Sequence, residues 1–369
     1  MPFFSTELSR NFIVFSLIAA AVFSGCRSQP EKAEDDFDEA GWYERVKAAD
    51  VSLLYAPHVD GKGKFFNPWM PRSEQPRRSG GPAGWLFRKK KEYPFPAEDY
   101  AHRENNYAYL KDREAESISF AGHASMIIKM DGETVFTDPF FSNRALVVGK
   151  KLKIPFDFSR VPEGPVVLIS HNHYDHLDKY SVKELIKKGA VFVAPLGLKK
   201  FFTKLGAKEV YELDWWQDIR IGSLSYTLLP AQHWSRRIGQ ASGGTLWGSY
   251  LIQGSKTVYF SGDTGYFRGF EEYGRRYRID YAILGAGAYE PRWFMHYSHM
   301  NVAEFFMAAE DLKASVAIPM HFGVISLSDE PPLYPLYEID EYLDKSPNGK
   351  AGLKGKIRPL RVGEYLDLR

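Results

Sequence analysis

The chain has 369 residues, of which 44% are hydrophobic and 25% are charged, so generic disorder, collagen and multi-span membrane proteins are excluded. Its formal net charge is only +2, far below the basic excess of a dedicated nucleic-acid-binding protein, and we expect no nucleic-acid partner. The single cysteine excludes an intrachain disulfide framework.

Residues 1–25 have the features of a secretory signal peptide. Residues 12–23 form an apolar run interrupted only by Ser16, which is too short to cross a bilayer as a helix. Two small residues follow, and then the sole cysteine, Cys26. This arrangement resembles a bacterial lipobox, so we expect lipidation of Cys26 and a membrane-anchored lipoprotein on the periplasmic or outer-membrane face of the cell envelope. An ordinary secretory signal or anchor with an incidental cysteine is the alternative.

Two segments without clear periodicity come next. Residues 26–54 begin with a strongly acidic stretch, which predicts a lipid-anchored tether. Residues 55–115 are rich in proline, glycine and basic residues and are expected to wrap the main domain as an irregular arm. Within the arm, basic residues between 72 and 91 lie among aromatics and could bind anionic lipid headgroups. A solvated loop would have the same composition.

Regular patterning begins at about residue 116 and indicates a hydrolase domain over residues 116–369. Strands are expected at residues 117–120, 125–130, 134–137, 165–170 and 191–194. The dipeptide Asp131-Gly132 predicts a hairpin turn. Ser181 and Glu184 form a candidate capping box for a helix before the last of these strands. The order strand, helix, strand predicts a βαβ unit.

A second series of elements follows in a similar order. Strands are expected at residues 223–229, 250–253, 257–261 and 315–318. Asn301 and Glu304 are expected to cap a helix. In each half a turn and a strand lead to an aspartate, Asp138 in the first half and Asp263 in the second. This weak internal repeat predicts two related halves, and therefore an α/β fold in which two sheets pack face to face with helices outside.

The segment His171-Asn172-His173-Tyr174-Asp175-His176 places four potential metal ligands within six residues, directly after a predicted strand. In an extended chain His171 and His173 point to the same side and can share one cation. Asp175 and His176 can reach a second cation beside it. Three of the chain's ten histidines lie here, a density that favours a metal site over exposed loop histidines.

This segment resembles the HxHxDH signature of the metallo-β-lactamase fold superfamily. The resemblance implies a four-layer αββα fold, with two β-sheets sandwiched between helices. It also implies a two-metal site completed by His233, by Asp263 as a bridge between the metals, and by His321. The full ligand set is His171, His173, Asp175, His176, His233, Asp263 and His321. Five histidines and two aspartates suit two zinc ions, and iron or manganese would fit the same set.

Further motifs resemble the N-acylphosphatidylethanolamine-hydrolysing phospholipase D family. They are FFNPW at 65–69, GHAS at 122–125, TDP at 137–139, ELDWW at 212–216, LWGS at 246–249 and AYEPRWFM at 288–295. The likeness covers most of residues 65–330, and the N-terminal region and the tail after residue 331 depart from it. It implies a zinc-dependent phosphodiesterase that converts the phospholipid to N-acylethanolamine and phosphatidic acid. It also implies a homodimer.

The resemblance assigns roles to individual residues. Two neighbouring cations lower the pKa of a shared water toward neutrality, so Asp175 and Asp263 would act in catalysis as metal ligands. His299 would stabilise the phosphoryl group or protonate the leaving oxygen, unless it is a surface histidine ahead of a helix. Asp138 is expected to orient a ligand histidine rather than to bind metal.

Substrate contacts are expected from the AYEPRWFM segment. Arg292 could pair with phosphate, with a structural salt bridge as the alternative. Tyr289 and Trp293 could line an acyl-chain groove, with core packing as the alternative.

Three other functions compete with the phospholipase assignment. One is a metal-dependent hydrolase of a soluble phosphoester or lactone, which would need a closed polar pocket. Another is an inactive envelope lipoprotein that uses the fold as a scaffold, although every expected ligand position is occupied. A nuclease of this fold would normally require a second domain for the polynucleotide, and the sequence leaves no room for one.

Overall fold

The computed structural model describes residues 37–71, 91–152, 156–345 and 355–368. The expected signal peptide, Cys26 and most of the basic stretch between 72 and 91 lie outside these residues. Apart from Phe37, the described residues belong to one compact unit. None of the helices within the described ranges is long and apolar enough to cross a bilayer.

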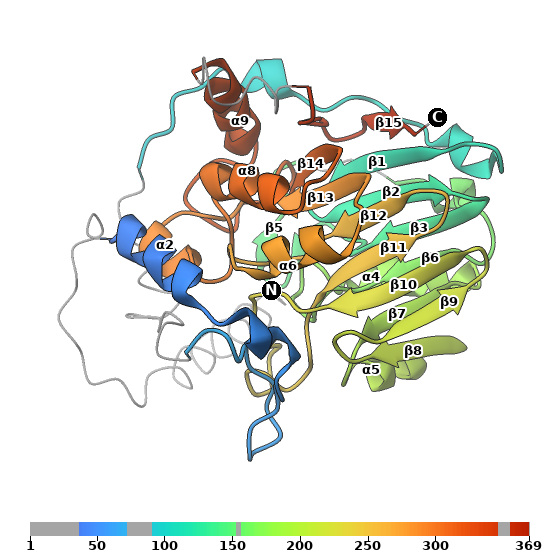
Figure 1. Cartoon of the computed structure of the whole chain (residues 1–369). Coiled ribbons are helices and arrows are strands. Elements are labelled where there is room, and N and C mark those ends of the chain that lie inside the picture. The colour runs from blue at the N-terminus through green and yellow to red at the C-terminus, as the bar shows by residue number, and fades with distance from the viewer. Residues whose placement is uncertain (1–36, 72–90, 153–155, 346–354, 369) are drawn as a thin grey trace, which may run out of the picture. The chain divides into compact units, whose positions relative to one another are not determined.

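Two β-sheets form the centre of the unit (Figure 1). The first has the strand order β15-β1-β2-β3-β6-β7-β8 and the second the order β14-β13-β12-β11-β10-β9. The first sheet comprises β1 (Ser117–Gly122), β2 (Ser125–Met130), β3 (Glu133–Thr137), β6 (Val166–Leu168), β7 (Val191–Pro195), β8 (Glu209–Leu213) and β15 (Tyr365–Asp367). The second comprises β9 (Asp218–Ile221), β10 (Leu224–Leu229), β11 (Ser249–Gln253), β12 (Thr257–Phe260), β13 (Tyr281–Gly285) and β14 (Val316–Met320). A separate small hairpin pairs β4 (Arg144–Ala145) with β5 (Val148–Gly149).

The sheets pack face to face, and helices cover their outer sides. The hydroxyl of Tyr250, on β11, crosses the interface and donates to the carbonyls of Ile169 and Val193 at 3.1 Å each. The helices are α2 (Glu39–Ala48), α4 (Lys179–Lys187), α5 (Lys199–Leu205), α6 (Gly269–Arg276), α7 (Arg292–Met295), α8 (Val302–Asp311) and α9 (Tyr334–Asp344), with 3₁₀ turns η1 (Val51–Tyr55), η3 (Ala97–Tyr100), η4 (Ala108–Lys111) and η5 (Phe158–Arg160). Leu185 of α4 and Phe202 of α5 pack on the first sheet, and α6 and α8 lie against the second (Figure 1). The expected four-layer α/β architecture is confirmed.

The internal repeat corresponds to a shared topology. In the first sheet the antiparallel pair β2–β3 is followed by the parallel strands β6 and β7. In the second, the antiparallel pair β11–β12 is followed by the parallel strands β13 and β14. Asp138 comes directly after β3, and Asp263 comes three residues after β12. The two aspartates therefore sit at matching places in the two sheets.

Two local expectations need correction. Asp178, not Ser181, caps α4, because its carboxylate accepts from the backbone N–H groups of Tyr180 and Ser181. Ser181 lies inside the helix and donates its hydroxyl to the same carboxylate. The later part of the expected tether is folded: α2 and η1 occupy residues 39–55, and Trp42 is fully buried. The capping box of α8, formed by Asn301 and Glu304, is confirmed.

Candidate metal centre

The expected ligands lie at one edge of the sandwich, in loops that follow strands of both sheets. His171, His173, Asp175 and His176 follow β6, His233 follows β10, Asp263 follows β12, and His321 follows β14. These strands run in the same direction within each sheet, so their carboxyl ends meet at that edge. The structure brings all seven residues into two adjacent groups and adds His123 to one of them.

The first group consists of His171, His173, His233 and Asp263. The Nδ1 atom of His173 lies 2.7 Å from Nε2 of His171 and 3.2 Å from Nε2 of His233. Asp263 Oδ2 is 3.7 Å from the Nε2 atoms of both His171 and His233. Four donor atoms thus converge within 4.8 Å of one another, which is the spacing that a single cation requires.

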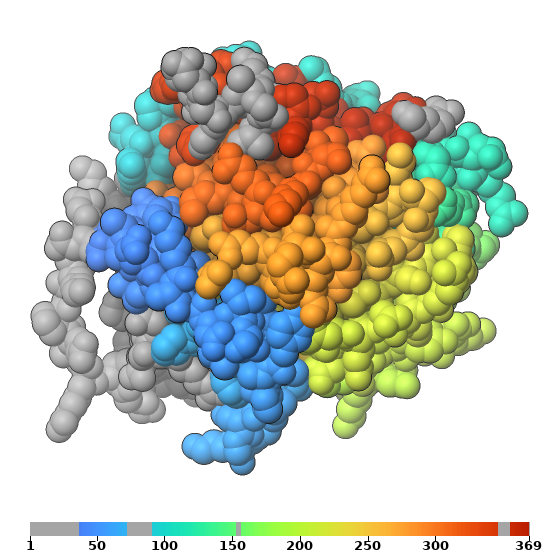
Figure 2. Space-filling view, in the orientation of Figure 1, coloured from blue at the N-terminus to red at the C-terminus, as the bar shows by residue number. Residues whose placement is uncertain are grey.

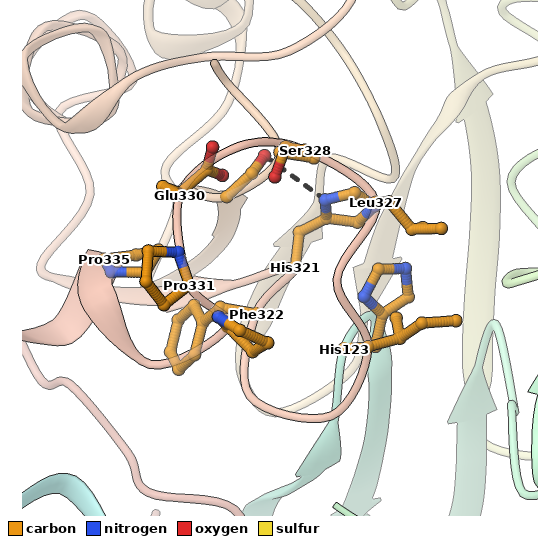
Figure 3. A pocket seen from close by; sticks show the side chains of 12 residues that line it. His123, His321, Phe322, Leu327, Ser328, Glu330, Pro331 and Pro335 are labelled. Atoms are coloured by element: carbon orange, nitrogen blue, oxygen red, sulfur yellow. Dashed lines mark hydrogen bonds between the residues drawn. The ribbon is translucent and has the colours of Figure 1, made fainter. Parts of the chain in front are cut away.

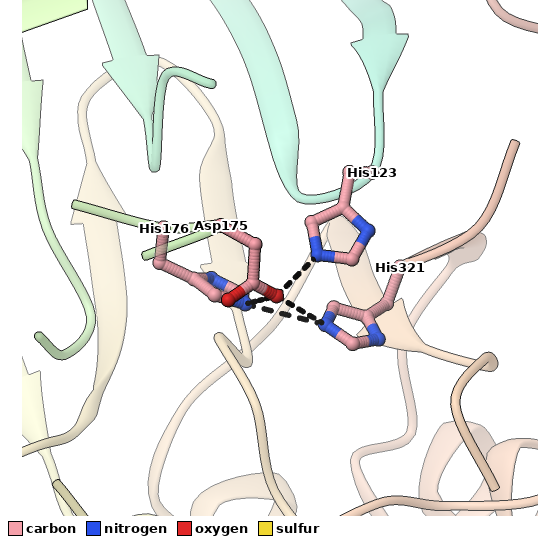
Figure 4. A group of neighbouring side chains, drawn as sticks. All are labelled: His123, Asp175, His176 and His321. Atoms are coloured by element: carbon pink, nitrogen blue, oxygen red, sulfur yellow. Dashed lines mark hydrogen bonds and ion pairs between the residues drawn. The ribbon is translucent and has the colours of Figure 1, made fainter. Parts of the chain in front are cut away.

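The second group consists of His123, Asp175, His176 and His321 (Figure 4). Asp175 Oδ2 lies 2.8 Å from His123 Nε2 and 3.3 Å from His176 Nε2. The Nε2 atoms of His176 and His321 are 3.2 Å apart. Figure 4 shows the four side chains pointing toward one another, with Asp175 and His176 on one segment and His123 and His321 on two others.

Asp263 joins the two groups. Besides its place in the first group, its Oδ2 atom is 3.1 Å from His176 Nε2 and its Oδ1 atom is 3.0 Å from His321 Nε2. The residue is only 5% exposed. A carboxylate in this position can bridge two cations held by the two groups.

Asp138 and Ser170 orient two of the imidazoles from behind. Asp138 Oδ2 accepts from His176 Nδ1 at 2.7 Å and from the Ser170 hydroxyl at 2.5 Å. Because the Ser170 hydroxyl donates its only proton to Asp138, its oxygen must accept a hydrogen bond from His171 Nδ1, which is 2.9 Å away. In both histidines the proton is therefore on Nδ1, and Nε2 presents a lone pair to the centre.

Backbone carbonyls orient two further imidazoles, those of His233 and His321, in the same way. Nδ1 of His233 faces the carbonyl of Ser298 at 3.2 Å, and Nδ1 of His321 faces the carbonyl of Gly287 at 3.3 Å. When each ring is neutral, all four Nε2 atoms thus carry lone pairs directed at one another and at carboxylates. This donor set fits divalent cations, which would sit among otherwise repelling lone pairs.

The electrostatics of the centre indicate a need for positive charge. Burial lowers the pKa of His171 and His233 well below the usual range. Burial also disfavours a charged His176, but the carboxylates Asp263, Asp175 and Asp138 outweigh it and raise the pKa of His176 well above normal. The carboxylates therefore favour a second proton on His176, at Nε2, and a bound cation would take the place of that proton.

His123 was not among the expected ligands. Its backbone N–H donates to the Phe322 carbonyl at 2.9 Å, and its carbonyl accepts from His321 N–H at 2.8 Å. It adopts a left-handed φ of 59°, which aims the ring at Asp175. Burial lowers its pKa to about 3, so the imidazole is neutral. The only sequence signal was its place in the motif GHAS, 48 residues before the first expected ligand.

His299 lies beside the centre, between α7 and α8. Its ring centroid is 5.4 Å from that of His233 and 5.1 Å from that of His321. It can also present a nitrogen close to the donor atoms of Asp263 and His321. Burial lowers its pKa to about 3, so the neutral ring has one N–H to offer. The structure thus places His299 beside the two ligand groups, and its contact with a phosphoryl group stays a prediction.

Two of the three residues expected to bind substrate in the AYEPRWFM segment make contacts inside the protein. Tyr289 is 3% exposed and donates its hydroxyl to Glu338 of α9, so it is a packing residue. Arg292 pairs with the buried Glu304 at 2.8 Å, so the structural salt bridge, not a phosphate contact, is its observed role. The alternatives kept for these two residues, core packing for Tyr289 and a structural salt bridge for Arg292, are therefore the contacts observed. Trp293 is partly exposed, and its substrate contact stays a prediction.

A small pocket adjoins His123 and His321 (Figure 3). Glu330 lies in its wall and is 3% exposed. Its two carboxylate oxygens accept from the backbone N–H groups of Tyr289 and Glu290, each at 3.1 Å. Burial raises the pKa of Glu330 to about 7. The carboxyl thereby ties the loop after β13, which includes Gly287, to the loop after β14.

Residues 133–322 match the model of the beta-lactamase superfamily domain. The chain belongs to the metallo-β-lactamase superfamily. All seven expected ligands of this superfamily member lie within the matched residues, whereas His123 lies outside them.

The sequence relatives of this superfamily member include both uncharacterised proteins and proteins named for an activity. It is 34% identical over 236 residues to an uncharacterized protein of Mycobacterium tuberculosis, a match that spans 60% of this chain and 63% of the relative. It is 31% identical over 255 residues to N-acyl-phosphatidylethanolamine-hydrolyzing phospholipase D 1 of Caenorhabditis elegans, spanning 63% of this chain and 69% of that protein. A UPF0173 metal-dependent hydrolase of Methanopyrus kandleri is 29% identical over 228 residues, 61% of this chain and 91% of the relative.

Solved structures share the fold. A metallo hydrolase from Ignicoccus hospitalis, Igni18, aligns with a TM-score of 0.52 and 22% identity. The alignment covers 69% of this chain and 98% of that one. The fold is therefore common to both, and about a third of this chain lies outside the alignment.

Proposed function

We propose that the protein is a metal-dependent hydrolase that cleaves a phosphodiester in the manner of a phospholipase D. The observation that carries the proposal is the place of Asp263, whose carboxylate belongs to the first ligand group and also lies within 3.1 Å of His176 and His321 in the second. Two adjacent cations are suited to displacement at phosphorus, since they can stabilise the attacking and leaving oxygens together. Two zinc ions are the proposed pair.

N-acylphosphatidylethanolamine is the proposed substrate. The support is the likeness to the Caenorhabditis elegans protein named for hydrolysis of this lipid and the shared motifs of residues 65–330. In the reaction, a water oxygen would bond to phosphorus while the bond from phosphorus to the ethanolamine oxygen breaks. The leaving oxygen takes a proton, and the products are N-acylethanolamine and phosphatidic acid.

The chain's own residues would each contribute a defined step. Bound cations would supply an activated water and positive charge for the phosphoryl oxygens. Asp138 keeps the Nε2 atom of His176 aimed at the centre. His299 would donate its N–H to a phosphoryl oxygen or to the leaving oxygen, since it stands beside both groups without being needed to complete either.

A membrane surface is the proposed working place. The tip of the β4–β5 hairpin exposes two apolar side chains, Leu146 at 44% and Val147 at 83%, and the basic residues Arg144 and Lys151 near it are exposed. Apolar tips beside basic residues suit an anionic lipid surface. Lipidation of Cys26 would hold the protein in the bacterial envelope.

The test uses residues 27–369, loaded with zinc and with bound metal quantified in each preparation. N-acylphosphatidylethanolamine in mixed micelles is the substrate, and products are identified by mass spectrometry. Wild type should release phosphatidic acid and N-acylethanolamine in equal amounts. Asp263→Asn should abolish release, whereas Asp218→Asn, which changes an exposed carboxylate on β9, should retain it. Intact lipid from metal-loaded wild type would refute the substrate assignment, and a soluble phosphodiester or lactone would then be tried.

A further inference from the structure

Helix α2 packs on the segment that carries His299. Trp42, on α2, is fully buried, and its ring meets that of His296 edge-on at a centroid distance of 4.6 Å. It also lies 6.5 Å from the ring of Tyr297. In the space-filling view the blue N-terminal surface abuts the orange surface of the later chain (Figure 2). A ten-residue helix is marginal by itself, so α2 depends on this docking.

Polar contacts join the same two segments. Arg292 Nε lies 3.5 Å from Glu39 Oε1, and the Asn301 side-chain amide donates to the same Glu39 oxygen at 2.8 Å. Tyr43 donates its hydroxyl to Glu39 at 3.1 Å. Arg292 also binds the fully buried Glu304 at 2.8 Å. One guanidinium thus links α2 to the start of α8, across both ends of residues 292–301.

Residues 292–301 reach the metal centre at two points. The carbonyl of Ser298 holds Nδ1 of His233 at 3.2 Å. The carbonyl of His299 accepts from Arg292 at 3.3 Å, so the guanidinium that binds Glu39 also fixes the backbone of His299. A shift of this segment would therefore move His299, and it would also break the contact by which the Ser298 carbonyl orients His233.

We propose that helix α2 is a positioning element of the metal centre, in which Glu39 and Trp42 hold residues 292–301 so that Ser298 orients His233 and His299 faces the reacting group. Neither Glu39 nor Trp42 touches a metal ligand in the described contacts, so both act through the segment. The part that concerns His299 rests on the proposed function, whereas the part that concerns His233 does not.

The test compares Glu39→Gln with Glu44→Gln, which changes an exposed carboxylate on the same helix. Trp42→Leu is the second variant. Hydrolysis of bis(p-nitrophenyl) phosphate gives kcat and KM without assuming a lipid substrate. The visible spectrum of the cobalt-loaded protein reports the geometry around His233, and thermal unfolding shows that each variant is folded.

Glu39→Gln and Trp42→Leu should lower kcat about tenfold, in line with the cost of small misplacements of catalytic groups. KM should stay nearly constant, the cobalt spectrum should change, and Glu44→Gln should resemble wild type. The inference is overturned if folded Glu39→Gln and Trp42→Leu match Glu44→Gln in both kcat and spectrum. If wild type does not hydrolyse the diester but the spectra of the two variants change, the proposed function fails and the positioning role of α2 stands.

Discussion

His176 donates its Nδ1 proton to Asp138 across 2.7 Å, and neither side chain exposes any surface. The same carboxylate accepts the hydroxyl proton of Ser170, which in turn faces His171. Asp138 therefore sets the orientation of one ligand in each group, although it need not touch a cation itself.

Asp138→Asn should weaken metal binding without unfolding the domain. An amide cannot accept from His176 and Ser170 as a carboxylate does, and loss of such an outer partner typically costs about 10- to 100-fold in metal affinity. Competition with a chromophoric chelator would measure the change, with the exposed Asp218→Asn as control. Equal affinities in the two variants would show that Asp138 does not orient the ligands.

His123→Asn should affect the second group more than the first. Asparagine tolerates the left-handed backbone of this position but cannot place a ring nitrogen on Asp175. Because the variant leaves the second group one donor short of four, we expect metal content after dialysis to fall from about two ions per chain to about one. Elemental analysis of the dialysed protein gives the count, and His102→Asn, an exposed histidine, is the matched control. Retention of both ions would contradict this role.

Glu330 should make the protein less stable as pH rises toward neutrality. Burial raises the pKa of this carboxyl from 4.5 to about 7, so between these values the folded chain holds a proton that the unfolded chain has released. The free energy of unfolding must then fall as pH rises through this window, by ~3 kcal/mol at most. Above pH 7 both states are ionised and the effect is constant.

Urea unfolding of wild type and Glu330→Gln between pH 5 and pH 8 would test this. The difference in unfolding free energy, wild type minus variant, should decrease up to about pH 7 and then level off. Using the difference removes the contribution of metal binding and of other titrating groups. Parallel pH curves would show that Glu330 keeps an ordinary pKa.

Much of the metal centre could be predicted because its ligands follow recognisable strands. Asp263 comes after a short run of β-branched and aromatic residues, and His171 follows PVVLIS. Such runs mark strand ends whatever the tertiary contacts are, and strand ends at one edge bring their loops together. The hairpin at Asp131 was predictable for a similar reason, since its turn chemistry is local.

Other features depend on contacts that leave no local pattern. His123 reaches the centre through a left-handed backbone and two hydrogen bonds to the loop after β14, neither of which a single histidine encodes. β15 is three residues long and exists because β1 offers it an edge. Tyr289 and Arg292 have the composition of a binding segment, but only the positions of Glu338 and Glu304 show that both side chains point into the protein.

Each ligand group takes residues from loops of both sheets. Bound metals would therefore have a structural role as well as a catalytic one. The first group draws on loops after β6, β10 and β12, and the second on loops after β6 and β14 and on the β1–β2 turn. A bound cation would therefore act as a cross-link between the two halves of the chain, closing loops as long as the 145 residues from His176 to His321. With a single cysteine, the protein has no intrachain disulfide to do this. Removing the metals with a chelator should accordingly weaken the packing of the two sheets against each other. The two halves of the chain should then unfold less cooperatively than they do with metal bound.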